Sequence, residues 1–118
     1  PVKQRLEMIQ KACLDIPQVD VDCFEGLLVD YMRHRGARVV IRGLRAASDF
    51  ESEFQMAQVN HQIFPQMETM FMMTSPQYGY ISSSVVREIA AFGGDVASMV
   101  PPAILPEIRK TFSPSPRD

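Results

Sequence analysis

The sequence has little that would indicate a metal site, an exported protein or a membrane protein. Its two cysteines, Cys13 and Cys23, have neither a C-x-x-C pair nor a companion histidine at zinc-ligand spacing. Isolated cysteines of this kind are typical of reduced, inert thiols and favour a cytoplasmic location. No apolar run approaches the ~20 residues that cross a bilayer, and no signal-peptide pattern is present. We therefore expect no structural metal ion and no membrane partner.

The sequence also lacks a strong excess of charge of either sign. Its formal net charge is -2, whereas proteins that bind duplex DNA or RNA usually present a basic face, so we expect no nucleic-acid partner. At 118 residues, with 46% hydrophobic and 22% charged residues, the composition is typical of a globular protein. The length predicts a single domain over residues 1–118, with a frayed tail at 113–118.

An initiator methionine is also absent, and the chain starts at Pro1 directly within a helical pattern. Apolar side chains recur there at helical spacing, at Val2, Leu6, Ile9, Cys13 and Ile16. A start inside an element suggests that residues upstream of Pro1 are missing.

The rest of the chain alternates between predicted helices and strands. Helical spacing predicts helices at 2–16, 27–36, 48–64, 84–92 and 103–112. In the second of these segments, Gly36 is the expected C′ residue that follows the last helical turn. Strands are predicted at 19–24, at 38–43 as a strand buried on both faces, and at the methionine-rich segment 67–73 as core. This order predicts an α/β fold with a parallel sheet and helices on both faces. Ligands of such sheets bind outside the carboxyl ends of the strands.

The helix predicted at 48–64 has clear start and stop signals. Ser48 and Glu51 have the spacing of a capping box, and Pro65 ends the pattern. One predicted face carries Phe50, Phe54, Ala57, His61 and Phe64. The shared apolar face favours a packed or interface role for His61 over a catalytic one.

Two arginines come after "VVI", at the carboxyl end of the strand predicted at 38–43. Arg42 and Arg45 flank Gly43 and Leu44, and guanidinium groups suit phosphate because they donate paired, charge-assisted hydrogen bonds. The alternative is a surface loop in which these arginines pair with Asp49 or Glu53. The position at the carboxyl end of a strand favours the phosphate site.

A second anion-friendly segment, "TSPQYGYISSSVVRE", follows the strand predicted at 67–73. Serines at a helix start supply hydroxyl groups and free backbone N–H groups. Arg87 would be unfavourable beside an empty helix N-terminus but would support a bound polyphosphate. The alternative is an ordinary helix cap with a solvated arginine. Together the two segments favour a nucleotide or another phosphorylated ligand.

The segments "VVIRGLRAASDFESEFQMAQVN" and "YISSSVVREIAAFGGDV" resemble the phosphopantetheine adenylyltransferase family, and "ISSSVVR" matches the nucleotidyltransferase signature "ISS-[ST]-x-x-[RK]". The resemblance implies a Rossmann-like nucleotidyltransferase fold. It also implies adenylyl transfer from ATP to 4′-phosphopantetheine in coenzyme A biosynthesis, giving dephospho-coenzyme A and pyrophosphate. Mg²⁺, a cytoplasmic location and a homohexamer are further expectations from the family.

The resemblance also implies roles for individual residues. Leu28 and Arg42 would bind 4′-phosphopantetheine, and Arg87 would contact phosphate. The ATP site would comprise Gly43, Leu44, Arg45, Glu53, Tyr78, Gly79, Tyr80, Ile81, Ser82, Ser83 and Ser84.

One family motif is not found in this sequence. The family carries a "[TS]-x-G-H" motif whose histidine is catalytic, but neither His34 nor His61 follows a glycine. The resemblance thus implies that the first βα unit is missing and that these 118 residues alone turn over negligibly. Two other functions stay open: a noncatalytic module that binds a phosphorylated ligand, and a related transferase with another phosphorylated acceptor.

Overall fold

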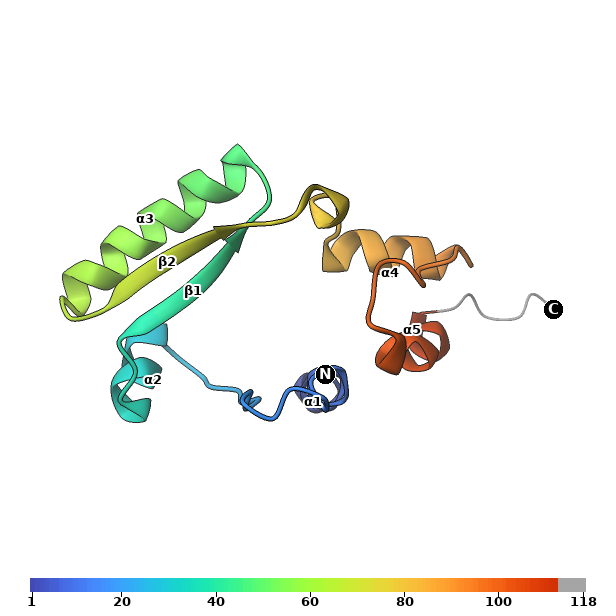
Figure 1. The fold of residues 1–118 in the computed structure, drawn as a ribbon, viewed down its shortest axis with the longest axis horizontal. Coiled ribbons are helices and arrows are strands. Elements are labelled where there is room, and N and C mark those ends of the chain that lie inside the picture. Colours follow the sequence, from blue (N-terminus) through green and yellow to red (C-terminus); the bar gives the residue numbers. More distant parts are fainter. Residues whose placement is uncertain (113–118) are drawn as a thin grey trace. The chain divides into compact units, whose positions relative to one another are not determined.

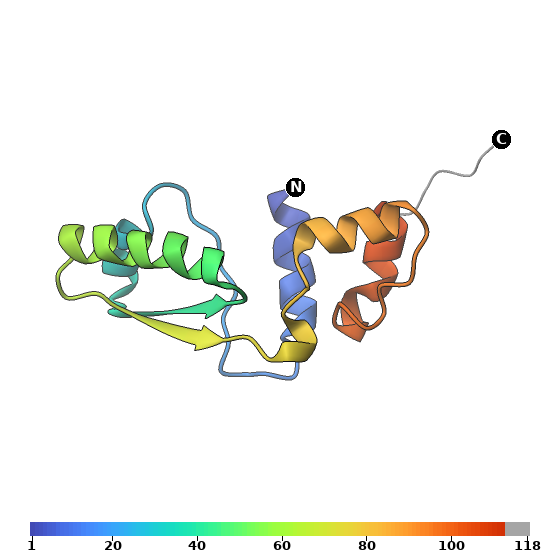
Figure 2. The same cartoon turned by 90° about the horizontal axis from the view of Figure 1, so that it is seen from above.

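The structure is a computed structural model that describes residues 1–112, so the tail predicted at 113–118 lies outside the described residues (Figures 1 and 2). Contacts between Cα atoms divide the chain into two compact units. One contains Phe24–Tyr80, and the other contains Pro1–Cys23 together with the chain from Ile81 onward. Each unit has a hydrophobic core of its own. The single domain inferred from length stays a prediction.

The unit Phe24–Tyr80 is an α/β unit built on two parallel strands. Its helices and strands are α2 (Leu28–Arg35), β1 (Val39–Leu44), α3 (Ala47–Ile63), β2 (Glu68–Met73) and the 3₁₀ turn η1 (Pro76–Tyr78). Val39 lies opposite Glu68, and the parallel register continues to Leu44 opposite Met73. Figure 1 shows α3 running alongside both strands as the crossover between them. The predicted α/β fold with a parallel sheet is confirmed.

Two arginine contacts attach α2 to the end of α3. Arg33 donates a hydrogen bond from Nη2 to the carbonyl oxygen of Ile63 at 2.8 Å, and its guanidinium carbon lies 4.7 Å from the ring centroid of Phe64. Helix α2 ends, as predicted, at Gly36, whose φ of 69° lies in the left-handed region that glycine adopts without strain. These contacts fix the position of α2 within the unit.

The core of this unit lies against one face of the sheet. Val29, Met32, Phe64 and Met67 are buried, and Val40 of β1 packs against them. Side chains alternate along a strand, so the neighbouring residues point to the other face. There Ile41 is 62% exposed and Met72 is 61% exposed. The prediction of a strand buried on both faces is therefore wrong for β1, because nothing among the described residues covers this face.

The methionines of segment 67–73, which were predicted to lie in the core, differ widely in exposure. Met67 is 1% exposed, whereas Met70 is 56% and Met73 is 91% exposed. Met70 and Met72 share the uncovered face of the sheet with Ile41. The prediction of core packing is therefore confirmed for Met67 and wrong for the later methionines.

Two predictions near the N-terminus are wrong, one of a strand and one of the end of a helix. Residues 19–24 form no strand, although they alternate apolar and acidic side chains, because the backbone finds no ladder partner among the described residues. Helix α1 (Val2–Ala12) ends four residues earlier than the predicted Ile16. Pro17 disfavours helical backbone in the residue before it, and a turn replaces the last part of the helix.

The start of α3 also differs from the predicted capping box. The N-cap residue is Ala46, and Ser48 lies inside the helix. The carboxylate of Asp49 instead accepts a hydrogen bond from the backbone N–H of Arg45 at 3.2 Å, so an acidic side chain in the first turn serves the helix start. Phe50 and Phe54, predicted for the packed face, are 45% and 47% exposed and stack on each other.

The second unit contains the remaining helices. They are α1, α4 (Ser83–Ala91), the 3₁₀ turn η2 (Pro102–Ile104) and α5 (Leu105–Phe112). Its core consists of Val86, Ala90, Val96 and Ile108, and Met8 of α1 packs against it. Lys11 pairs with Glu107 at 3.1 Å, which joins α1 to α5. No helix in the described part of the chain is long and apolar enough to cross a membrane.

Candidate functional site

Arg42 on β1 forms a two-point ion pair with Glu53 on α3. Nε donates to Oε2 at 2.8 Å and Nη2 donates to Oε1 at 2.6 Å. The Arg42 side chain is 50% exposed and the Glu53 side chain is 21% exposed. The hydrogen bond from Arg42 holds the pKa of Glu53 below its ordinary value of 4.5. Both groups therefore carry full charge at neutral pH.

Arg45 forms a second pair just beyond the end of β1. Its Nε donates to Oδ2 of Asp49 at 3.1 Å, and this hydrogen bond lowers the pKa of Asp49. Both arginines thus meet the acidic partners that the surface-loop alternative named. Such pairing does not exclude a ligand, since a guanidinium group has five N–H donors and a side-on carboxylate occupies only two.

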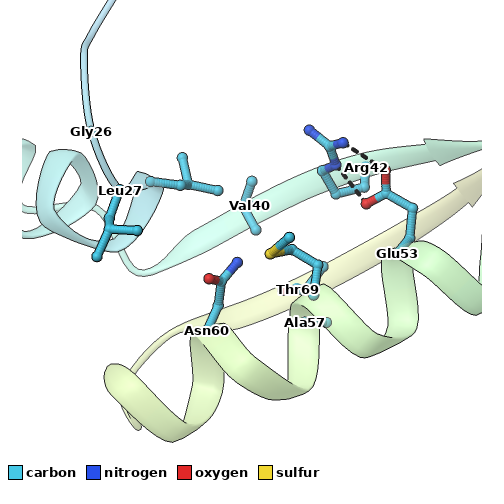
Figure 3. Close-up of a pocket in the computed structure, with 10 residues that line it drawn as sticks. Gly26, Leu27, Val40, Arg42, Glu53, Ala57, Asn60 and Thr69 are labelled. Carbon is cyan, nitrogen blue, oxygen red and sulfur yellow. Dashed lines mark hydrogen bonds and ion pairs between the residues drawn. The ribbon is translucent and has the colours of Figure 1, made fainter.

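A cavity of about 280 Å³ lies beside the Arg42–Glu53 pair, between β1, β2, α3 and the segment that leads into α2 (Figure 3). We call it the Arg42 pocket. Its lining residues are Gly26, Leu27, Leu28, Val40, Arg42, Glu53, Met56, Ala57, Asn60 and Thr69. The structure therefore brings together Leu28, Arg42 and Glu53, three of the residues singled out from sequence.

Sequence reasoning missed most of this lining. On α3 the missed residues are Met56, Ala57 and Asn60, which continue from Glu53 at spacings of three, four and seven residues. That spacing places all four on one helix face, so the signal was present. Gly26 and Leu27 carry no such signal. Gly26 has a φ of 92°, a conformation that glycine adopts readily, and it directs the chain past the pocket into α2.

The lining of the Arg42 pocket suits an elongated ligand with an anionic end. Leu27, Leu28 and Val40 supply aliphatic wall, while Asn60 offers an amide that can both donate and accept hydrogen bonds. Among the described residues that line the pocket, Arg42 is the one that carries a positive charge. The pocket volume lies near the lower end of the ~300–1,000 Å³ typical of ligand pockets, so a slender ligand fits best.

The end of β2 lies beside the end of β1 and leads into the predicted nucleotide segment. Thr74 donates a backbone hydrogen bond to the carbonyl oxygen of Leu44 at 2.8 Å. The turn η1 follows, with Tyr78 and Tyr80 half-exposed and Gly79 between them. These three residues belong to the α/β unit, whereas Ile81 to Ser84 belong to the other unit.

The start of α4 offers hydrogen-bond donors, and it lies one residue before the predicted start at residue 84. Ser82 is the N-cap, and its Oγ accepts a hydrogen bond from the backbone N–H of Val85 at 3.2 Å. Ser83 and Ser84 are exposed in the first turn, where backbone N–H groups lack helical acceptors. Because the helix begins at Ser83, Arg87 lies in the second turn and is exposed. It is thus one residue farther from the helix start than the predicted start at residue 84 would place it.

None of the described residues that line the Arg42 pocket is a histidine or a cysteine. Nδ1 of His61 lies 3.0 Å from the carbonyl oxygen of Met67, and His34 is in the last turn of α2. Cys13 and Cys23 are free thiols. Over residues 1–112, no group of three histidine, cysteine or acidic side chains is arranged to hold a metal ion.

Comparison with known proteins shows which family this chain is similar to. Residues 1–89 match the model of a family described as cytidylyltransferase-like. The chain is similar to the phosphopantetheine adenylyltransferase of Syntrophotalea carbinolica, with 53% identity over 116 residues, 98% of this chain and 70% of the relative. It is also similar to the enzymes of that name from Rubrobacter xylanophilus (52% identity, 95% of this chain, 68% of the relative) and Heliobacterium modesticaldum (49%, 97% and 68%).

Proposed function

This chain belongs to the phosphopantetheine adenylyltransferase family of cytidylyltransferase-like proteins, and on that premise we propose that it transfers an adenylyl group from ATP to 4′-phosphopantetheine. The products are dephospho-coenzyme A and pyrophosphate, which makes the protein a nucleotidyltransferase of coenzyme A biosynthesis. A cytoplasmic homohexamer is part of the proposal, on the basis of the family resemblance.

The observation that carries the proposal is the Arg42 pocket. The acceptor has a phosphate at one end, a dimethyl-substituted carbon near it, two amides and a terminal thiol. Arg42 can bind the phosphate, the aliphatic wall around Leu28 can pack against the arm, and Asn60 can bind an amide. A slender molecule with one anionic end matches each of these features.

The ATP side of the proposal uses the strand-end loop and the serine-rich helix start. Gly43 and Leu44 at the end of β1 and Arg45 just beyond it contact the nucleotide, and the resemblance adds Glu53. The segment Tyr78–Ser84 wraps the ATP, and Ser83 and Ser84 donate from hydroxyl and backbone N–H groups to its phosphates. Arg87 supplies a further cation to the same phosphates.

The chemistry is an in-line displacement at phosphorus. An oxygen of the acceptor phosphate forms a bond to the α-phosphorus of ATP, the bond from that phosphorus to the bridging oxygen breaks, and pyrophosphate leaves. Such transfers depend chiefly on positioning the reactants and on stabilising charge on the transferred group. Arg42 positions the attacking phosphate, and Arg45 and Arg87 help to stabilise the charge on the transferred group.

Magnesium enters the proposal with ATP. The described residues do not fit a protein-built site, because the two carboxylates nearest the loop, Asp49 and Glu53, already bind arginines. Mg²⁺ commonly binds substrate phosphates and keeps several waters, with few protein ligands. It would therefore arrive as the ATP complex and lower the negative charge of the phosphates.

The proposal is tested by measuring pyrophosphate release from the natural gene product that carries these residues. We expect release that requires both ATP and 4′-phosphopantetheine, with dephospho-coenzyme A identified by mass spectrometry. Nicotinate mononucleotide and glycerol phosphate serve as alternative acceptors. Turnover with either of these in place of 4′-phosphopantetheine would identify a different transferase, and binding without turnover would identify a noncatalytic module.

A further inference from the structure

We propose that the protein has a second anion-binding site, at the amino ends of the two strands, which takes a small ligand with two or more negative charges. The site is a cavity of about 360 Å³ in the α/β unit, which we call the Arg38 pocket. Its lining residues are Arg33, Gly36, Ala37, Arg38, Phe64 and Gln66. None of them lines the Arg42 pocket, so the proposal does not depend on the proposed function.

The Arg38 pocket lies where α2 leads into β1, at the opposite end of the strand from the groups assigned to the reaction (Figure 1). Arg38 precedes the first residue of β1, whereas Arg42 lies near the carboxyl end of the strand and Arg45 just beyond it. An extended chain rises ~3.3 Å per residue, so the backbones of Arg38 and Arg42 are about 13 Å apart. A ligand in the Arg38 pocket would therefore occupy neither substrate site.

The Arg38 pocket combines two guanidinium groups with, among the described residues of its lining, no carboxylate. Arg38 is exposed, and no other described residue forms an ion pair or a hydrogen bond with its side chain. In contrast, Arg42 and Arg45 each bind a carboxylate. Two cations that share a cavity repel each other, and a ligand with at least two negative charges would remove that repulsion.

Arg33 is held in place but keeps donors for a ligand. Its Nη2 donates to the carbonyl oxygen of Ile63, and its guanidinium carbon lies over the ring of Phe64. Nη1 is 3.7 Å from Oδ1 of Asp30, which is longer than a hydrogen bond, and both side chains of this pair are exposed, so the pair contributes little. Since a guanidinium has five N–H donors, Arg33 can bind a phosphate or carboxylate and keep the contacts that position it.

The end of α2 beside the pocket would by itself oppose an anion, because a helix C-terminus carries partial negative charge. Arg33, His34 and Arg35 form the last turn of α2 and offset this charge. The side-chain amide of Gln66 adds a further hydrogen-bond donor to the lining. The cavity volume is near the lower end of the ~300–1,000 Å³ typical of ligand pockets. The site therefore fits a small phosphate ester or a small polycarboxylate, which present the same charged oxygens to arginine.

The test titrates ¹⁵N-labelled natural gene product with inorganic phosphate and, separately, with citrate, at constant ionic strength. We expect saturable shifts of the backbone amide signals of Gly36 and Ala37 and of the side-chain amide signal of Gln66. Arg38→Met should weaken the binding seen at these signals about tenfold, because it removes a charged hydrogen-bond donor. Tighter binding of phosphate would identify the ligand as a phosphate ester, and tighter binding of citrate would identify it as a polycarboxylate.

The matched control is Arg35→Met, which removes an exposed arginine of α2 that does not line the pocket. It should leave the dissociation constant of either probe unchanged. Equal weakening in the two variants would reduce the effect to general charge attraction and overturn the proposal. Shifts in wild type that are absent at these three residues, or that grow without saturating, would also overturn it. Because the signals report binding without turnover, a failure of adenylyl transfer would leave this result unaffected.

Discussion

Two segments rich in anion-binding groups, the end of β1 and the start of α4, both favour a phosphorylated ligand by sequence but differ in structure. In the first, Arg42 and Arg45 are each held by a carboxylate on α3, beside a pocket with apolar walls. In the second, Ser83, Ser84 and Arg87 are exposed. The two arginines are therefore held in place before a ligand binds, whereas no ion pair among the described residues holds Arg87. Substitution of Arg42 should act on acceptor recognition, and substitutions in the helix should act on ATP.

The largest expected effect is at Arg42. In the natural gene product, Arg42→Met should lower kcat/KM for 4′-phosphopantetheine about 100-fold, since it removes a charged hydrogen-bond donor and leaves Glu53 without its partner. Steady-state kinetics with each substrate varied in turn measure the change. Arg38→Met, which removes an exposed arginine just before β1, is the control and should stay near wild type. Equal losses in the two variants would mean that net charge matters and the pocket does not.

Charge reversal at Arg87 should have the next largest effect. Arg87→Glu should raise the KM for ATP about tenfold through repulsion of the phosphates, with little change in the KM for the acceptor. Lys3→Glu alters the net charge equally from the first turn of α1 and should leave both constants unchanged. Unaltered ATP affinity in the Arg87 variant would return this residue to the solvated-surface interpretation.

Two serines at the start of α4 should affect different properties, one the stability of the protein and the other the binding of ATP. Ser82→Ala removes the N-cap hydrogen bond to Val85 and should cost about 1 kcal/mol of unfolding free energy. Ser84→Ala should leave the Tm near that of wild type and raise the KM for ATP. Thermal unfolding and kinetics on the two variants provide the measurement, and the prediction fails if the two serines behave alike.

The smallest effect is the pH dependence of the Arg42–Glu53 pair. Because the folded-state pKa of Glu53 lies below 4.5, the contribution of the pair to stability is fully present above that value and is lost as the pH falls through the lowered pKa. The Tm difference between wild type and Glu53→Gln should follow this course, and at neutral pH it should correspond to at most about 1 kcal/mol for so exposed a pair. A difference that persists unchanged in acid would assign it to packing.

Local signals predicted much of the α/β unit. Gly36 and Pro65 placed the ends of α2 and α3, and the β-branched run placed β1, because backbone preferences act within a few residues. The two strands, joined through a helix, also predicted the parallel pairing correctly.

The structural features that the sequence did not predict depend on contacts with residues distant along the chain. Residues 19–24 have the alternation of a strand, but a strand exists only where another backbone pairs with it. Ile41 and Met72 have core-type side chains, yet their exposure depends on what covers the sheet. At the site, the sequence named both candidate partners of the arginines without assigning them. The Arg42 pocket itself could not be predicted, because it forms only where α3, β1 and the Gly26 turn meet in the folded chain.

A thermodynamic cycle can test whether Arg42 binds the acceptor phosphate in the Arg42 pocket. Calorimetric affinities would be measured for 4′-phosphopantetheine and for pantetheine, which lacks the phosphate, with wild-type gene product and with Arg42→Met. We predict strong coupling: the phosphate should improve binding to wild type by about 10- to 100-fold and should add almost nothing in the variant. A phosphate contribution of equal size in both proteins would mean that Arg42 does not bind the acceptor phosphate.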